Sequence, residues 1–80
     1  MNALLKRITL DPRVMDGKPC IRGMRVTVGA IIGLLAAKHT IDEILDAYPY
    51  LERDDIYAAL EYAAMRTQER EVEIMISAAA

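Results

Sequence analysis

Residues 40–56 of this 80-residue chain read TIDEILDAYPYLERDDI, and this stretch decides the fold. At its start Thr40 and Glu43 form a capping box, in which each side chain satisfies the backbone amide of the other residue. Apolar residues then recur at the spacing of one helical face: Ile41, Ile44 and Leu45. Because the residue before a proline disfavours helical geometry, the Tyr48-Pro49 step ends the predicted helix near Ala47.

A further helix is predicted after this short connection, over about residues 53–70. Asp54 and Asp55 lie at its start, where the helix dipole favours negative charge. Arg66 and Arg70 lie at its end, where the dipole favours positive charge. Its predicted buried face is narrow and consists of Ile56, Ala59, Leu60 and Ala63. The opening stretch therefore predicts two helices joined by a short turn.

An earlier helix, over about residues 28–39, has no polar face until Lys38. Thr27 is its predicted N-cap. A helix that is apolar all round is buried all round, yet a chain of this length offers hardly enough protein to surround it. We therefore predict a homodimer through the arm and this helix, with interface residues Gly29, Ile32, Gly33 and Ala36. The alternative is that the two glycines lie against this chain's own helices.

The residues before the three helices predict a short β-structured arm. Residues 8–10 are β-prone, and Asp16-Gly17 is a typical turn dipeptide. Residues 20–26 alternate apolar and basic side chains apart from Gly23, which predicts a strand with a bulge at this glycine. The expected fold class is mainly α with a short β-structured N-terminal arm.

Length and composition indicate one small domain. A hydrophobic fraction of 54% and a charged fraction of 28% exclude a disordered tail. We divide residues 1–80 into the arm (1–26), the three helices (27–70) and a tail (71–80). A domain of this size buries only about 60% of the surface of its unfolded chain, so we expect a second copy to support the core.

Single cysteine and histidine residues limit the chemistry and the compartment. Cys20 alone cannot form an intrachain disulfide, which indicates a cytoplasmic protein. Cys20 and His39 are too few for a structural zinc site, and we expect no metal and no cofactor. We expect no signal peptide and no membrane association, because the longest nearly apolar stretch, residues 26–37, is shorter than the ~20 residues that span a bilayer.

The formal net charge of −2 conceals two oppositely charged halves. Residues 1–40 contain seven lysines and arginines and two acids, a charge of +5. Residues 41–80 contain three arginines and ten acids, a charge of −7. Any functional interpretation has to account for this division.

Several segments, taken together and in order, resemble the bacterial domain-of-unknown-function 433 (DUF433) family. They read ITLDP (8–12), GKPCIRGMRVTV (17–28), TIDEIL (40–45), YPYL (48–51), DI (55–56) and AALEYA (58–63). The resemblance covers about residues 8–64. It departs at Glu52, where relatives often have Ser or Thr, and at Met24, where Thr is common. It implies a homeodomain-like trihelical helix-turn-helix fold, and a VapB-like antitoxin encoded beside a PIN-like ribonuclease toxin.

Nucleic-acid binding, if it occurs, is expected through the arm. In a helix-turn-helix the helix after the turn reads the major groove, but here its acids would face phosphates. We instead predict phosphate or base contacts from Lys18, Arg22 and Arg25. The alternative is that Arg22 or Arg25 forms a structural ion pair with an acid of the second half: Asp42, Asp46 or Asp55.

The tail offers a surface for a protein partner. Val72, Ile74 and Ile76 share one face of a predicted strand that could extend a partner's sheet, with Glu71 and Glu73 on the other face. Arg66 and Arg70 are the nearest basic candidates for the carboxylate-rich metal site of a toxin. The alternatives are pairing with this chain's own arm or with its dimer mate, and simple fraying.

The sequence contains no catalytic constellation, and we expect no enzyme. Cys20 between Pro19 and Ile21 is interpreted as a small hydrophobe, and His39 as the residue that closes the first helix. The expected function is that of an antitoxin-like binding protein that neutralises a ribonuclease toxin and represses its own operon. A stand-alone DNA-binding transcriptional regulator and a structural dimer module are the alternatives.

Overall fold

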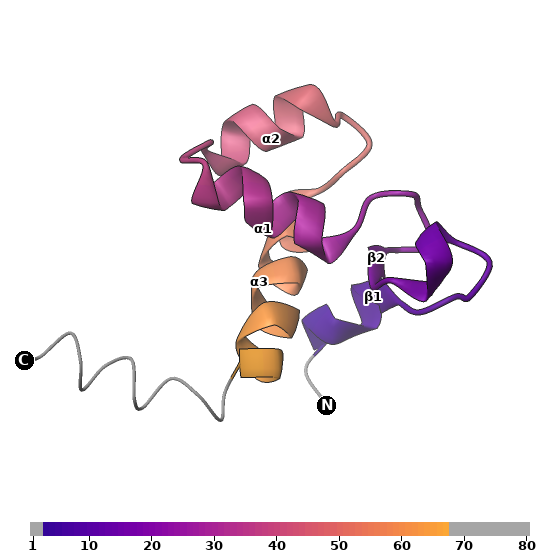
Figure 1. The fold of residues 1–80 in the computed structure, drawn as a ribbon. Coiled ribbons are helices and arrows are strands. Elements are labelled where there is room, and N and C mark those ends of the chain that lie inside the picture. Colours follow the sequence, from indigo (N-terminus) through magenta and orange to yellow (C-terminus); the bar gives the residue numbers. More distant parts are fainter. Residues whose placement is uncertain (1–2, 68–80) are drawn as a thin grey trace, which may run out of the picture.

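Three α-helices follow a short β-structured arm in the computed structural model, which describes residues 3–67 (Figure 1). The arm contains two 3-10 turns, η1 (Ala3–Arg7) and η2 (Met15–Gly17), and two strands, β1 (Ile8–Thr9) and β2 (Cys20–Ile21). The helices are α1 (Val28–Ala36), α2 (Ile41–Ala47) and α3 (Arg53–Thr67). This mainly α fold with a short β-structured N-terminus confirms the predicted fold class.

β1 and β2 form a two-stranded antiparallel sheet, in which Ile8 pairs with Ile21 and Thr9 with Cys20. The predicted strand over residues 20–26 with a bulge is wrong. β2 ends at Ile21, because Arg22 and Gly23 adopt left-handed φ angles of 44° and 72°. The Met24 amide donates to the Ile21 carbonyl at 2.8 Å, which closes a tight turn of the type that hairpins favour.

α1 begins as predicted, with the Thr27 hydroxyl accepting a hydrogen bond from the Ala30 amide. It ends at Ala36, three residues before the predicted end at His39. Lys38 takes a left-handed φ of 73°, and the amides of Lys38 and His39 donate to the carbonyls of Leu35 and Leu34. This is the Schellman pattern that ends many helices, here with a lysine where glycine is usual.

α2 is a short helix with both halves of the predicted capping box. The Thr40 hydroxyl accepts from the Glu43 amide, and the Glu43 carboxylate accepts from the Thr40 amide. The helix ends at Ala47, as the following Tyr48-Pro49 step predicts. α2 contributes Ile44 to the core, where this side chain is almost completely buried.

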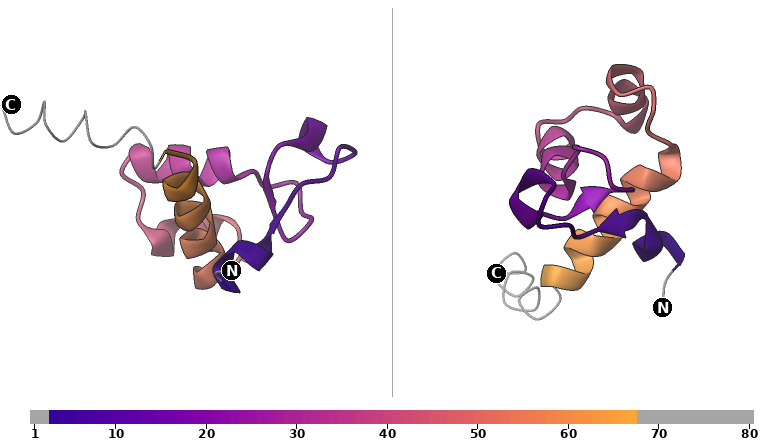
Figure 2. Two further views of the ribbon diagram at one scale, coloured as in Figure 1. Left: turned by 90° about the horizontal axis from the view of Figure 1, so that it is seen from below. Right: turned by 90° about the vertical axis from the view of Figure 1, so that its right-hand side faces the viewer.

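The buried face of α3 matches the predicted one in part, and Ala63 of the predicted face is half-buried. Ile56 and Ala59 are buried as expected, but Leu60 is 39% exposed. Asp55 and Ala58 are buried instead, because the arm packs along this side of the helix. The views of Figure 2 place η1 beside α3. The described part of α3 ends at Thr67, so the predicted end near residue 70 lies outside the described residues.

The core lies where the arm, α1, α2 and α3 meet. Its buried apolar residues are Ile21, Val26, Val28, Ile31, Ile44, Leu51, Ile56 and Ala59. The prediction that α1 is buried all round is wrong for the single chain. Only Val28 and Ile31 of this helix are fully buried, and its opposite face is exposed. No helix among residues 3–67 is long and apolar enough to span a membrane.

Candidate functional site

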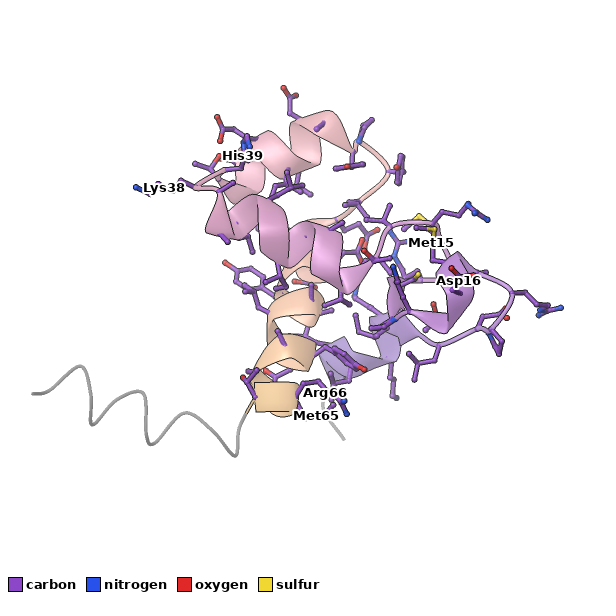
Figure 3. The ribbon with its side chains drawn as sticks, in the orientation of Figure 1. Met15, Asp16, Lys38, His39, Met65 and Arg66 are labelled. Atoms are coloured by element: carbon purple, nitrogen blue, oxygen red, sulfur yellow. The ribbon has the colours of Figure 1, made fainter. Side chains whose placement is uncertain are left out.

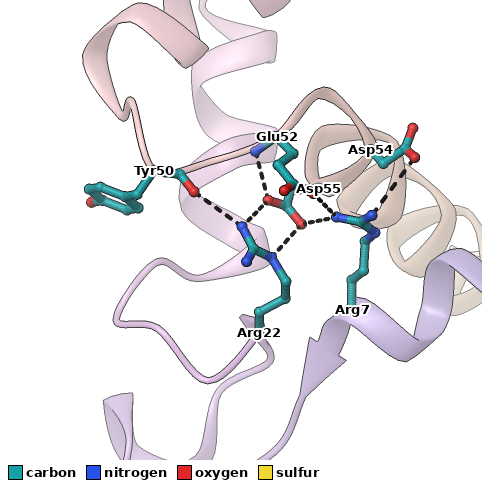
Figure 4. Close-up of polar contacts among 6 residues, drawn as sticks. All are labelled: Arg7, Arg22, Tyr50, Glu52, Asp54 and Asp55. Carbon is teal, nitrogen blue, oxygen red and sulfur yellow. Dashed lines mark hydrogen bonds and ion pairs between the residues drawn. The ribbon is translucent and has the colours of Figure 1, made fainter.

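The most concentrated polar arrangement in the molecule joins the arm to the start of α3 (Figure 4). The Arg22 guanidinium donates to both Asp55 carboxylate oxygens, from Nε at 3.0 Å and from Nη2 at 2.8 Å. Arg7 donates to the same carboxylate at 3.0 Å and to Glu52 at 2.7 Å. Arg22 Nη2 also donates to the Tyr50 carbonyl at 3.1 Å. Two arginines of the basic half therefore hold the acidic end of α3.

Asp55 is fully buried, although Arg53 and Asp54, the two residues before it in α3, are exposed. One carboxylate oxygen accepts a hydrogen bond from the Glu52 backbone amide at 2.8 Å. This is one of the two hydrogen bonds of a capping box, the one in which the side chain of the third helical residue reaches back to the residue before the helix. Glu52, where a Ser or Thr cap was expected, is thereby compensated by Asp55. Every described buried side-chain N or O atom, this carboxylate included, has a hydrogen-bond partner.

Burial and hydrogen bonding act on the pKa of Asp55 in opposite directions. Burial of the carboxylate raises the pKa, whereas hydrogen bonds from Arg22, the Glu52 amide and Arg7 lower it. The hydrogen bonds prevail, and the pKa of Asp55 lies below its ordinary value. The hydrogen bonds that Arg22 donates to Asp55 raise the pKa of Arg22. Asp55 is therefore a structural anion that stays charged at neutral pH.

The structure separates the three predicted nucleic-acid-binding residues. Arg22 forms the ion pair with Asp55 that was its structural alternative. Lys18 and Arg25 are exposed, and neither has an acidic partner within residues 3–67. Arg25 therefore does not form the ion pair that was its own alternative. Contact of these side chains with nucleic acid stays a prediction.

The start of α3 is occupied by intramolecular ion pairs. Arg7 lies 3.8 Å from Asp54, in addition to its contacts with Glu52 and Asp55. Arg53 is paired with Asp42 of α2. A helix that reads a groove would present free donors at this end. Here Arg7 and Arg53 are engaged by acids of this chain, and the outward face of α3 carries exposed Tyr57 and Leu60.

The face of α1 opposite the core consists of very small residues. Those exposed are Gly29, Ala30, Gly33, Ala36 and Ala37. Within residues 3–67, a methyl group added at Gly33 would meet no atom outside the backbone of its own helix turn within 4 Å, and one at Gly29 would meet only the Thr27 hydroxyl at 4.0 Å. The alternative that these glycines lie against this chain's own helices is therefore wrong. Of the four predicted dimer residues, Ile32 is half-buried against the core.

The other residues considered in the sequence analysis do not lie together in one site. Cys20 is buried, and its thiol lies 3.2 Å from the Lys18 carbonyl. His39 and the exposed Lys38 lie just after α1, whereas Met65 and the exposed Arg66 lie in the last turn of α3 (Figure 3). No group of metal-ligating side chains occurs among residues 3–67. Four partner-binding predictions lie outside the described residues: Arg70, Val72, Ile74 and Ile76.

Sequence reasoning missed Arg7 and the central place of Asp55. Arg7 was counted only as part of a basic half, and Asp55 was one of three acids offered as partners. One signal was available, because an acid at the third helical position commonly accepts a backbone amide of the preceding turn. The approach of Arg7 over 48 positions of sequence depends on tertiary packing.

Comparison with known proteins finds relatives whose function is unknown. The family described as "Protein of unknown function (DUF433)" matches residues 8–63. An uncharacterized protein, y4eO, of Sinorhizobium fredii (strain NBRC 101917 / NGR234) is 36% identical over 56 residues, which are 70% of this chain and 25% of that protein. This chain thus spans about a quarter of its relative's length.

A solved structure shares the fold. It is the crystal structure of a DUF433 member protein from Anabaena variabilis ATCC 29413, with a TM-score of 0.69 and 26% sequence identity. The similarity covers 92% of this chain and 69% of the other. The arm and the three helices are therefore an architecture that occurs in more than one protein.

Proposed function

Because this chain belongs to the DUF433 family, whose function is unknown, we propose a function from its own surfaces. It is a non-enzymatic, antitoxin-like binding protein of the cytoplasm. It neutralises a cognate PIN-like ribonuclease toxin by protein–protein contact, and its complex represses the shared operon. In this proposal α2 and α3 keep the arrangement of a helix-turn-helix, but α3 contacts protein instead of DNA.

The outward face of α3 is the observation that carries this proposal. Tyr57 is 44% exposed and Leu60 is 39% exposed, and both side chains are large enough to anchor a protein interface. Asp54 is exposed and Glu61 half-exposed on the same helix. An apolar centre with an acidic rim suits a basic protein surface, whereas the acids would repel a phosphate backbone.

The end of α3 supplies the second part of the proposed contact. Arg66 is exposed in the last turn, and Arg70 follows it at the distance of one helical turn in sequence. In the proposal these arginines approach the carboxylate-rich metal site of the toxin, where a guanidinium can bind a carboxylate in two places. Val72, Ile74 and Ile76 add apolar contacts beside them.

A homodimer through α1 completes the proposal. The exposed Gly29, Gly33 and Ala36 allow another backbone to approach closely, which a helix with longer side chains would prevent. An apolar helix face without a partner is also costly to expose to water. A second copy placed on this face would cover it.

Co-expression tests the proposal directly. The full chain is produced with the product of the neighbouring gene, the two are purified together, and ribonuclease activity is measured. We expect a stable complex without ribonuclease activity. Leu60→Asp should weaken the complex, whereas Arg13→Ser, on the exposed arm, should leave it intact. A neighbour that is never retained, or that stays fully active in the complex, contradicts the proposal.

DNA binding by the arm is the second candidate, favoured by Lys18 and Arg25, which have no acidic partner in the part of the chain that the structure describes. In a mobility-shift assay with the operon's upstream DNA, Lys18→Ala and Arg25→Ala should each weaken binding and reduce its salt dependence. Arg13→Ala is the matched control, because Arg13 is paired with Asp11 at 3.1 Å. No shift at low salt would remove this candidate. Absence of both DNA binding and a toxin complex would leave a structural dimer module.

A further inference from the structure

An apolar pocket of about 400 Å³ lies between the arm and the last turns of α3. Its lining residues are Leu5, Lys6, Ile8, Leu10, Tyr62 and Met65. Leu10 is 64% exposed and Met65 is 46% exposed, so two large apolar side chains of this pocket face water in the described part of the chain. An apolar pocket of this size is a candidate docking site.

The chain itself continues past this pocket. α3 is described to Thr67, two residues after Met65, and residues 68–80 follow. Four residues lie between Thr67 and Val72, and the five Cα–Cα steps can reach at most about 17 Å. Tyr62 lies about 7.5 Å back along the helix axis from Thr67, at 1.5 Å per residue. The linking segment is therefore long enough to turn back over the last turns of α3.

Pattern and charge both fit the following segment to the pocket. Val72, Ile74 and Ile76 alternate with other residues, so an extended segment would present all three on one side. Lys6 is the one charged residue of the lining, and it is exposed without an acidic partner among residues 3–67. The segment supplies acids on its other side, at Glu71 and Glu73.

We propose that residues 72–76 of the same chain dock in this pocket, with Ile74 near Leu10 and with Glu73, on the solvent side of the segment, within reach of the long exposed Lys6 side chain. The segment that the proposed function offers to a toxin is thereby covered in the free protein. The inference does not rest on that function, because the docking involves this chain alone.

Disulfide trapping in the full chain tests the docking. Leu10→Cys and Ile74→Cys are combined, and the buried Cys20 is retained. The control pair is Leu60→Cys with Ile74→Cys, because Leu60 is also exposed on α3 but lies on its outward face. We expect the first pair to form an intramolecular disulfide at least tenfold faster than the control. Equal rates would overturn the proposal, and so would disulfide-linked dimers as the main product, which would place a second copy in the pocket.

A measurement without new cysteines gives an independent answer. Methyl NMR spectra of the full chain should show displaced Ile8 and Leu10 signals in Ile74→Ser, because the docked side chain would leave their surroundings. Ser77→Ala is the control and should leave these signals in place. Unchanged Ile8 and Leu10 signals in Ile74→Ser would overturn the proposal.

Discussion

The Arg22 guanidinium donates hydrogen bonds to both oxygens of the buried Asp55 carboxylate, from Nε at 3.0 Å and from Nη2 at 2.8 Å. The two residues are 33 positions apart in the sequence. This pair joins the turn that ends β2 to the first turn of α3. Arg7 adds a second cation to the same carboxylate. Some of the positive charge of the first half is therefore neutralised by acids of the second half within the molecule. These ion pairs hold the arm against α3.

Asp55→Asn should destabilise the fold strongly. Removal of one partner from a buried ion pair costs about 3–5 kcal/mol, and the lower end applies here because the Arg22 side chain is 37% exposed and can be hydrated. Urea unfolding followed by circular dichroism would measure the change. Asp54→Asn is the matched control, since this exposed acid lies 3.8 Å from Arg7 and should cost less than about 1 kcal/mol. Equal losses in the two variants would contradict the central place of Asp55.

The same carboxylate should make stability depend on pH in the acid range. The pKa of Asp55 in the folded protein is below its ordinary value of 3.8, so the unfolded chain binds this proton more readily. Its contribution to the free energy of unfolding is thus complete above that value, and is lost as the pH falls through the folded pKa. Unfolding curves measured from pH 6 to pH 2 should show that the free energy of unfolding falls more steeply in the wild type than in Asp55→Asn. Parallel profiles would show that Asp55 is not the titrating group.

Lys38→Gly should stabilise the protein by about 0.5–1 kcal/mol. Lys38 has a φ of 73° at the position after the α1 C-cap, where glycine carries no steric cost. Ala37→Gly is the control, because Ala37 has an ordinary φ of −82° and a glycine there should destabilise. Thermal unfolding would separate the two, and a lower melting temperature for Lys38→Gly would contradict the assignment of this cap.

Gly33→Gln should disrupt the proposed dimer and leave the fold intact. A side chain at this position meets open space in the single chain, so folding should be unimpaired, and replacement of a mid-helix glycine should even favour α1. In a dimer the added atoms would separate the two backbones. Sedimentation equilibrium should then show monomers for Gly33→Gln and dimers for Ala47→Gln, an exposed position on α2. A dimer that persists in Gly33→Gln would place the interface elsewhere.

Local signals predicted the helices well and the arm poorly. Thr27, Thr40 and Glu43 are hydrogen-bonding caps whose effect is confined to one turn, and all three act as the sequence indicates. The end of α1 was misplaced, because Lys38 adopts a conformation that the sequence favours only for glycine or asparagine. The strand over residues 20–26 was overextended for a related reason, since Arg22 takes a left-handed φ in the turn.

The exposed and buried faces were harder to predict than the helices themselves. Leu60 was expected in the core, because apolar spacing alone fixes the face of an isolated helix. In the structure Leu60 is exposed and Asp55 is buried, since Arg7 and Arg22 arrive from the arm and make burial of the carboxylate favourable. Such burial depends on contacts between distant segments, which no local pattern contains.

In the function that we propose, this protein acts by contact with a protein partner. Titration of the neighbouring gene product's ribonuclease activity with the purified full chain tests this claim most directly. We predict that activity falls to the level of a reaction without ribonuclease once a fixed ratio of the two proteins is reached, and that Leu60→Asp requires a large excess to do the same. Full ribonuclease activity in the presence of excess wild-type protein would contradict the claim.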